Sequence, residues 1–108
     1  MLKHLVCYGT VSLLLIFTGS ATSLAQTAAE TYVAKCQACH AADGSGDTPA
    51  GKAMKARPFK SPDVLKESDA DLIAIIKNGK EKMPAFLGKI TDAQITDLVA
   101  CIHTLQKK

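Results

Sequence analysis

The chain has 108 residues and a formal charge of +3, and 47% of its residues are hydrophobic. This length suits one compact domain, and we expect no second module. The positive charge comes without blocks of Lys and Arg or interleaved aromatic residues, which excludes a typical nucleic-acid-binding protein. Because the chain has no Trp, three Phe and two Tyr, we expect a cofactor, metal or covalent staple to complete its small core.

Residues 1–25 are predicted to be a secretory signal peptide. Lys3 and His4 form a short basic start, residues 5–17 form an apolar run, and Ser23-Leu24-Ala25 is a small-x-small cleavage site. The alternative is an uncleaved membrane anchor, but the run is shorter than the roughly 20 apolar residues that span a bilayer. We therefore expect an exported, periplasmic protein whose domain covers residues 26–108.

The first half of this domain is predicted to hold one clear helix and one long loop. Ala-rich residues 28–39 have helical spacing and run into a pair of cysteines. Residues 41–62 are rich in Gly, Asp, Ser, Thr and Pro, which predicts a loop that wraps around something. Ser61-Pro62 then starts a short helical turn that reaches Lys66.

Two better-defined helices follow. Ser68 and Asp71 cap the first, which ends at Asn78-Gly79. After a second loop over residues 80–90, Thr91 and Gln94 form a capping box for the last helix. With no strand pattern, the predicted fold class is all-α, with three or four helices and long loops.

The cysteines indicate a covalently bound cofactor. Cys7 lies in the predicted signal, so 4 − 1 = 3 cysteines remain, and an odd number argues against a disulfide framework. Cys36 and Cys39 stand with His40 in C-x-x-C-H, the pattern for haem attachment. A thioredoxin-like redox pair is disfavoured without a βαβ pattern, and a structural zinc site lacks a second paired motif.

Each motif residue has a chemical role in such a site. Cys36 and Cys39 each add a thiol to one haem vinyl group, which forms two thioether bonds, and His40 donates Nε2 to iron as the proximal ligand. The other nitrogen of this ring needs an acceptor, and the backbone carbonyl of Pro49 or a neighbour is our candidate.

Met83 is predicted to be the second axial ligand. Pro84 restricts the backbone of Met83 to extended conformations, which can aim its side chain at a fixed target. Met54 is the fallback ligand, and a Met that fills a gap in the core is the structural alternative. His/Met ligation closes both axial positions and so favours electron transfer over the binding or activation of oxygen.

Taken together, these motifs resemble the small one-haem class I cytochromes c of bacteria. The resemblance covers essentially all of the chain after the signal. It implies the all-α cytochrome c fold, with crossing terminal helices, a haem edge exposed in a cleft, Met83 as the distal ligand and a proline near the proximal histidine. The segments that carry it are Cys36-x-x-Cys39-His40, Asp43-Gly44-Ser45-Gly46-Asp47-Thr48-Pro49, Asn78-Gly79-Lys80, Lys82-Met83-Pro84-Ala85-Phe86 and Leu98-Val99-x-x-Ile102.

Two further residues have open interpretations. Cys101 stands where many relatives carry an aromatic residue; we predict a buried small hydrophobe, with a disulfide-linked dimer or a redox-sensing thiol as alternatives. Arg57, the only arginine, suits bidentate pairing with a haem propionate or is a solvated surface residue.

Two groups of side chains are expected around the cofactor. The apolar candidates for the pocket wall are Phe59, Leu72, Ile76, Phe86, Leu87 and Val99. A basic rim that attracts acidic partners is expected from Lys52, Lys55, Lys77, Lys80, Lys82 and Lys89, with scattered solvated lysines as the alternative.

The predicted function is that of a soluble, monomeric electron carrier with one covalent haem c that cycles between Fe(III) and Fe(II). Its expected partners are redox proteins with acidic docking surfaces, with no nucleic acid and with membrane contact only through partners or an uncleaved signal. The alternatives are a haem peroxidase, an electron-entry subunit of a larger complex, or a haem-based sensor. A peroxidase or a sensor needs an open iron site, whereas an electron-entry subunit does not. Ligation of the iron by Met83 therefore discriminates among these alternatives.

Overall fold

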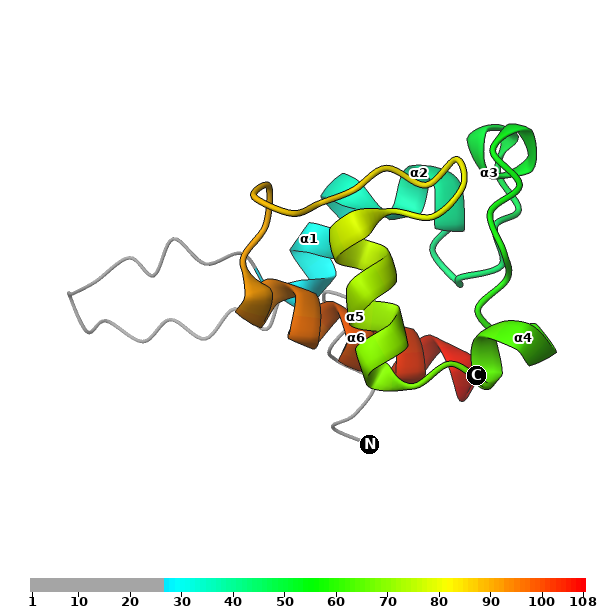
Figure 1. Cartoon of the computed structure of the whole chain (residues 1–108). Coiled ribbons are helices and arrows are strands. Elements are labelled where there is room, and N and C mark those ends of the chain that lie inside the picture. The colour runs from blue at the N-terminus through cyan, green and yellow to red at the C-terminus, as the bar shows by residue number, and fades with distance from the viewer. Residues whose placement is uncertain (1–26) are drawn as a thin grey trace, which may run out of the picture.

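The computed structural model describes residues 27–108, and the predicted signal peptide lies outside them. Six α-helices and no β-sheet are found in this part of the chain (Figure 1). The helices are α1 (Ala28–Lys35), α2 (Gln37–His40), α3 (Pro49–Ala53), α4 (Pro62–Leu65), α5 (Asp69–Asn78) and α6 (Asp92–Gln106). The predicted all-α class is confirmed, and the two helices beyond the four predicted, α2 and α3, have only four and five residues.

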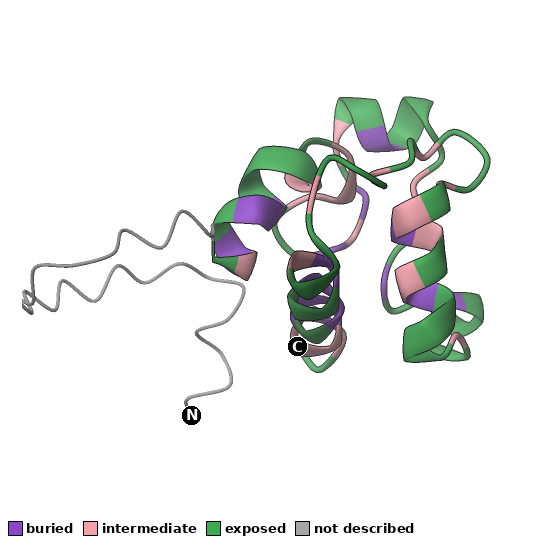
Figure 2. Cartoon of the chain, turned by 60° about the vertical axis from the view of Figure 1, so that its left-hand side comes forward, coloured by how far each residue is buried: buried purple, intermediate pink, exposed green. Residues whose placement is uncertain are grey.

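The core lies along α6, the longest of these helices. Ile95, Leu98 and Leu105 on α6 are at most 2% exposed, and in Figure 2 the buried residues form a stripe along this helix. Both α1 and α5 pack against α6 (Figure 1). Cys101 on the same helix is fully buried, as predicted, so that a small thiol fills a position in the core.

Both predicted capping boxes are present. Ser68 Oγ accepts a bond from the Asp71 N–H, and the Asp71 carboxylate accepts one from the Ser68 N–H. Thr91 and Gln94 exchange the same pair of bonds at the start of α6. These reciprocal bonds satisfy N–H groups that a helix start leaves unpaired, which explains why the starts of α5 and α6 were predictable.

The first predicted helix is wrong in one respect, because it breaks at Cys36. This residue has φ −119°, so α1 ends before it and the four-residue α2 begins after it. The break still keeps the Cys36 N–H bonded to the Tyr32 carbonyl at 2.9 Å. The Tyr32 hydroxyl reaches past α2 and donates to the Ala41 carbonyl at 2.6 Å, which fastens the two helices together.

The first predicted loop, residues 41–62, contains a helix that the prediction missed. Thr48 caps α3 by accepting a bond from the Gly51 N–H at 2.8 Å, and Pro49 occupies the first helical position. Proline is favoured there because its missing N–H would be unpaired in any case.

In the described part of the chain, no helix is both long and apolar enough to cross a membrane.

Candidate functional site

A large cleft brings together side chains from α1, α2, α5 and α6 and from the segments that join them. Its empty space is about 1160 Å³ including the open mouth. Four of the predicted wall residues line it, namely Phe59, Leu72, Ile76 and Phe86. Val99 instead packs in the core, where Leu98 and Ile102 of the same helix face the cleft, and Leu87 is 64% exposed outside it.

The whole C-x-x-C-H motif lies on the wall of this cleft. Cys36, Cys39 and His40 all line it, and the His40 N–H bonds the Cys36 carbonyl at 2.9 Å. Burial, with smaller contributions from Cys101 and Cys39, raises the pKa of the Cys36 thiol to about 11. Both motif thiols and the imidazole are therefore presented to one space, as thioether attachment and iron ligation require.

Helix α3 supports the motif from behind. Thr48 Oγ1 donates to the Ala38 carbonyl at 2.7 Å while it accepts the bond that caps α3. A Cβ atom at Gly51 would overlap the carbonyl oxygens of Cys39 and Gly46, so only glycine permits this close approach. The packing of α3 on α2 therefore fixes the backbone that carries the two thiols.

The His40 ring is partly buried and packs against Phe59. Their ring centroids are 4.8 Å apart, and the Tyr32 ring makes an edge-on contact with Phe59 at 6.4 Å. Burial, and secondarily the charge of Arg57, lowers the pKa of His40. The ring is thus neutral near pH 7, which is the form that ligates a metal.

The acceptor predicted for the second ring nitrogen of His40 is not found in the described part of the chain. Nδ1 of His40 is buried and has no hydrogen-bond partner among residues 27–108. Pro49 is the first residue of α3 and is exposed. The expected bond to Pro49 is therefore absent.

Met83 and Met54 both line the cleft, but they differ in burial. Met54 is 41% exposed, whereas Met83 is partly buried and packs against the core. The loop that carries Met83 is held by two bonds, because Met83 and Lys80 exchange N–H to carbonyl bonds at 2.9 and 3.2 Å. A Cβ at Gly79 would come within 2.6 Å of the Met83 carbonyl, so this turn is also tightly packed.

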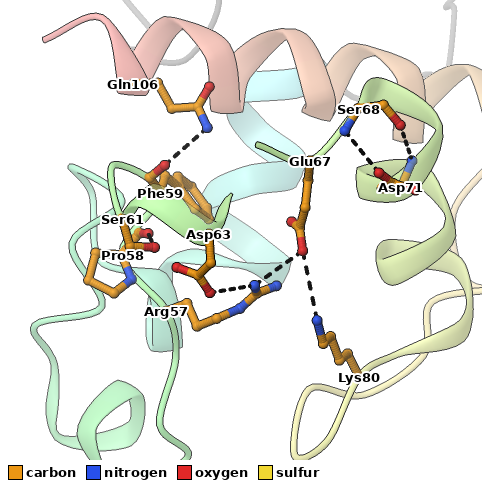
Figure 3. A network of polar contacts seen from close by, with 10 residues as sticks. All are labelled: Arg57, Pro58, Phe59, Ser61, Asp63, Glu67, Ser68, Asp71, Lys80 and Gln106. Atoms are coloured by element: carbon orange, nitrogen blue, oxygen red, sulfur yellow. Dashed lines mark hydrogen bonds and ion pairs between the residues drawn. The ribbon is translucent and has the colours of Figure 1, made fainter. Parts of the chain in front are cut away.

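Arg57 lines the cleft and is held by two carboxylates (Figure 3). Its Nη1 lies 2.9 Å from Asp63 Oδ2 and 3.1 Å from Glu67 Oε1, so it is neither a simple solvated residue nor an unpaired one. This bond lowers the pKa of Asp63 to about 2. Lys80 approaches the same Glu67 oxygen at 3.8 Å, while the other oxygen, Oε2, is buried without a partner in the described chain.

The basic rim is smaller than predicted. Lys55, Lys80 and Lys82 line the cleft, together with Lys35, which the sequence did not single out. The other predicted members are engaged elsewhere: Lys52 pairs with Asp47, Lys77 pairs with Asp92, and Lys89 lies over the Phe86 ring.

Sequence reasoning also missed two polar residues. Glu67 was not distinguished from other surface acids, although it lies at the cleft opposite the only arginine. His103 received no role, yet both of its ring nitrogens have close partners. The contacts that distinguish them have no local signal, because Glu67 bonds Arg57 from ten residues away and His103 bonds Asp69 from 34 residues away.

An apolar cleft with two thiols and a neutral imidazole on one wall, in an all-α frame, is the arrangement of a c-type cytochrome. Residues 23–102 match the family model described as "Cytochrome C oxidase, cbb3-type, subunit III". The chain therefore belongs to this cytochrome c family and is a small class I c-type cytochrome.

Known proteins of similar sequence and structure agree. Cytochrome c6 of Thermosynechococcus vestitus is 33% identical over 98 residues, which cover 90% of this chain and 85% of that protein. Cytochrome c6 of Synechococcus elongatus is 35% identical over 74 residues, covering 68% and 82%. The solved structure of the KustC0563 c-type cytochrome superposes with a TM-score of 0.65 at 30% identity, covering 71% of this chain and 94% of that one.

The protein is an electron carrier rather than an enzyme, and its cofactor is one haem c attached through Cys36 and Cys39. The residues present fit this group, since the thiols, the apolar walls and the unpartnered His40 nitrogen all face or border one cleft. When bound, the haem supplies an iron that cycles between Fe(III) and Fe(II).

Proposed function

We propose that this cytochrome is a periplasmic shuttle that carries single electrons between larger redox proteins, with His40 and Met83 as the two axial ligands. The observation that carries the proposal is that both side chains line one cleft, each on a braced segment. Two protein ligands leave no open position for substrate, so electron transfer is the chemistry that remains.

Support for His40 comes from its burial and its neutral ring. The Phe59 ring at 4.8 Å limits how the imidazole can turn, and the lowered pKa keeps a lone pair available for iron at neutral pH. A metal-bound histidine requires an acceptor for its second nitrogen, and Nδ1 is the buried atom that lacks one here. We infer that a small shift of residues 46–49 supplies a carbonyl when the ring binds iron.

Support for Met83 over Met54 comes from the loop that carries it. Met83 is packed against the core and held by its paired bonds with Lys80. Met54 follows the last turn of α3 and is more exposed. A ligand on a braced loop holds its geometry in both oxidation states, which lowers the reorganisation that each electron transfer requires.

Arg57 is assigned to the haem propionates. One of its nitrogens is taken by Asp63 and Glu67, and the rest of its five N–H donors are available to an anion in the cleft. The two carboxylates then hold the guanidinium in a fixed orientation.

Docking is assigned to the mouth of the cleft. Lys35, Lys55, Lys80 and Lys82 line it against Glu67 and Glu81, so its charge is positive. Such a surface attracts acidic partners and speeds their approach at low salt. Residues 1–25, as a signal peptide, export the chain to the periplasm where these partners reside.

Voltammetry of the haem-loaded protein tests the ligand assignment. The wild type should give a reversible one-electron wave, and Met83→Ala should lower its potential because a Met ligand raises the potential of a haem. Met54→Ala is the matched control and should leave the wave in place. If Met54→Ala lowers the potential and Met83→Ala does not, Met54 is the ligand.

A second candidate, an electron-entry subunit of a larger oxidoreductase, is favoured by the matching family, whose description names an oxidase subunit. Size-exclusion chromatography of a host extract, monitored at the haem absorbance, separates the two. A shuttle elutes near the mass of the chain itself, whereas a subunit elutes with its complex.

A further inference from the structure

The side chain of His103, on α6, lies between two acceptors. Its Nε2 is 2.6 Å from Oδ1 of Asp69, at the start of α5, and its Nδ1 is 2.9 Å from Oε1 of Gln106, one turn further along α6. Gln106 in turn donates its Nε2 to the Phe59 carbonyl at 3.0 Å (Figure 3). These contacts join α5, α6 and the segment before α4.

The geometry fixes the protonation of the imidazole. A backbone carbonyl only accepts hydrogen bonds, so the Gln106 amide group must face Phe59 and its oxygen must face His103. Nδ1 must then carry a proton. The Asp69 carboxylate also only accepts, so Nε2 must carry one too. All three bonds are satisfied together only when His103 is an imidazolium.

We propose that His103, Asp69 and Gln106 form a protonation-dependent latch that holds Phe59 against the proximal histidine of the haem site. When His103 loses a proton, either Nε2 meets the carboxylate without a hydrogen, or Gln106 turns its amide to Nδ1 and releases the Phe59 carbonyl. Because the Phe59 ring lies 4.8 Å from His40, release loosens one wall of the site. This consequence for the iron rests on the proposed ligation by His40.

The surroundings of His103 favour the closed latch. Hydrogen bonding to Asp69, and then to Gln106, raises the pKa of His103 above its usual 6.5, while burial and, more weakly, the charge of Lys107 just after α6 oppose this rise. Asp69 and Lys107 are the charged groups that face the ring from α5 and the end of α6 among the described residues. A raised pKa means that the latch contributes fully below about pH 6.5 and is lost as pH rises through the folded value.

Asp69→Asn is the discriminating variant. An Asn amide donates to a neutral Nε2 or accepts from a protonated one, so the other two bonds persist in either state of His103. The latch should then stay closed at any pH. Asp97→Asn is the matched control, because it removes the same charge from an exposed position of α6 that makes no side-chain bond or ion pair within residues 27–108.

The experiment measures, by NMR on the haem-loaded protein from pH 5.5 to 9, the hydrogen-exchange protection of the Phe59 N–H, which bonds the Gly44 carbonyl at 2.9 Å. In the wild type and in Asp97→Asn, protection should fall by roughly three- to tenfold as His103 titrates, the factor for one hydrogen bond. In Asp69→Asn it should not change. Equal pH profiles in the wild type and Asp69→Asn would overturn the proposal.

The same samples separate this inference from the proposed function. In the oxidised protein, iron-shifted resonances of His40 should move with pH in the wild type and stay constant in Asp69→Asn. If these resonances are absent, the ligation by His40 fails while the Phe59 profile still tests the latch. If they are present but do not follow the Phe59 profile, the link from Phe59 to His40 is wrong.

Discussion

Ala41, directly after the motif, has a backbone conformation that is unusual for a residue with a side chain. Its φ of 66° and ψ of 166° lie in a region that is essentially reserved for glycine. The strain comes with two useful contacts, because the Ala41 carbonyl accepts the Tyr32 hydroxyl and the turn returns the chain to α3. Strain at this position is therefore part of how the motif is anchored.

Ala41→Gly should raise the free energy of unfolding by about 1 kcal/mol. The gain is the relief of about 1–3 kcal/mol of backbone strain, less about 0.5–1 kcal/mol for the greater freedom of glycine in the unfolded chain. Urea unfolding of the haem-loaded protein measures it. Ala42→Gly, at a neighbouring position without a positive φ, should be neutral or destabilising. Equal effects at both positions would refute the strain at Ala41.

For single residues, the sequence predicts chemical roles well and contact partners within the fold poorly. Cys36, Cys39 and His40 were identifiable because covalent attachment demands fixed spacing within five residues. The contact partners of Pro49 and Arg57 were not, because they depend on where α3 and α4 fold back. Arg57, for example, reaches Glu67 ten residues away, which no local pattern indicates.

Helices were predictable where their ends carry their own hydrogen bonds. The capping boxes at Ser68 and Thr91 are contained within four residues, so they appear in the sequence as they do in the structure. The break at Cys36 has no such local cause. Residues 28–39 have continuous helical spacing, and the chain bends only where α3 and the 41–48 turn meet the motif.

Thr48→Ala should lower the free energy of unfolding by roughly 2 kcal/mol. The hydroxyl caps α3 and also donates to the Ala38 carbonyl, and a lost cap alone costs about 1 kcal/mol. Thr96→Ala is the control, since its hydroxyl only bonds a carbonyl within its own helix and should change stability by less than about 0.5 kcal/mol. Chemical denaturation compares the two, and similar losses would mean that α3 does not brace the motif.

For the whole molecule, the cleft and the core share one wall. Buried residues of α5 and α6 line the cleft and belong to the same apolar cluster as the core along α6, and a haem in the cleft would extend that core. The few aromatic residues in the sequence predicted a small core that a cofactor completes, and the helical periodicity predicted the all-α class. The sequence did not predict which residues form the walls of the cleft. Leu98 and Val99 are neighbours on one helix, and only the packing of that helix decides which of them faces the cleft.

A chain that cannot attach haem should lack a cooperative unfolding transition. Replacing Cys36 and Cys39 by Ala leaves the apolar walls exposed to water, and a domain of this size has little other core to compensate. Thermal unfolding followed by circular dichroism measures the effect. A sharp, cooperative transition in the double variant would contradict this view of the core.

Electron exchange with an acidic partner should slow when charge at the cleft is reversed. Lys82→Glu places a negative charge on the lining of the mouth, whereas Lys60→Glu makes the same change away from the cleft. At low salt the first should reduce the second-order rate several-fold more than the second, and the difference should shrink as salt screens the charges. Stopped-flow oxidation measures both rates, and equal slowing would place docking elsewhere.

The most direct test of the His40 and Met83 assignment is an optical spectrum of the oxidised, haem-loaded wild type beside Met83→Ala. The wild type should show low-spin haem with a weak near-infrared band from sulfur bound to iron, and the variant should lose that band. A high-spin spectrum that is the same in both proteins would show an open iron site, and would contradict the conclusion that a closed site makes this protein a carrier of electrons.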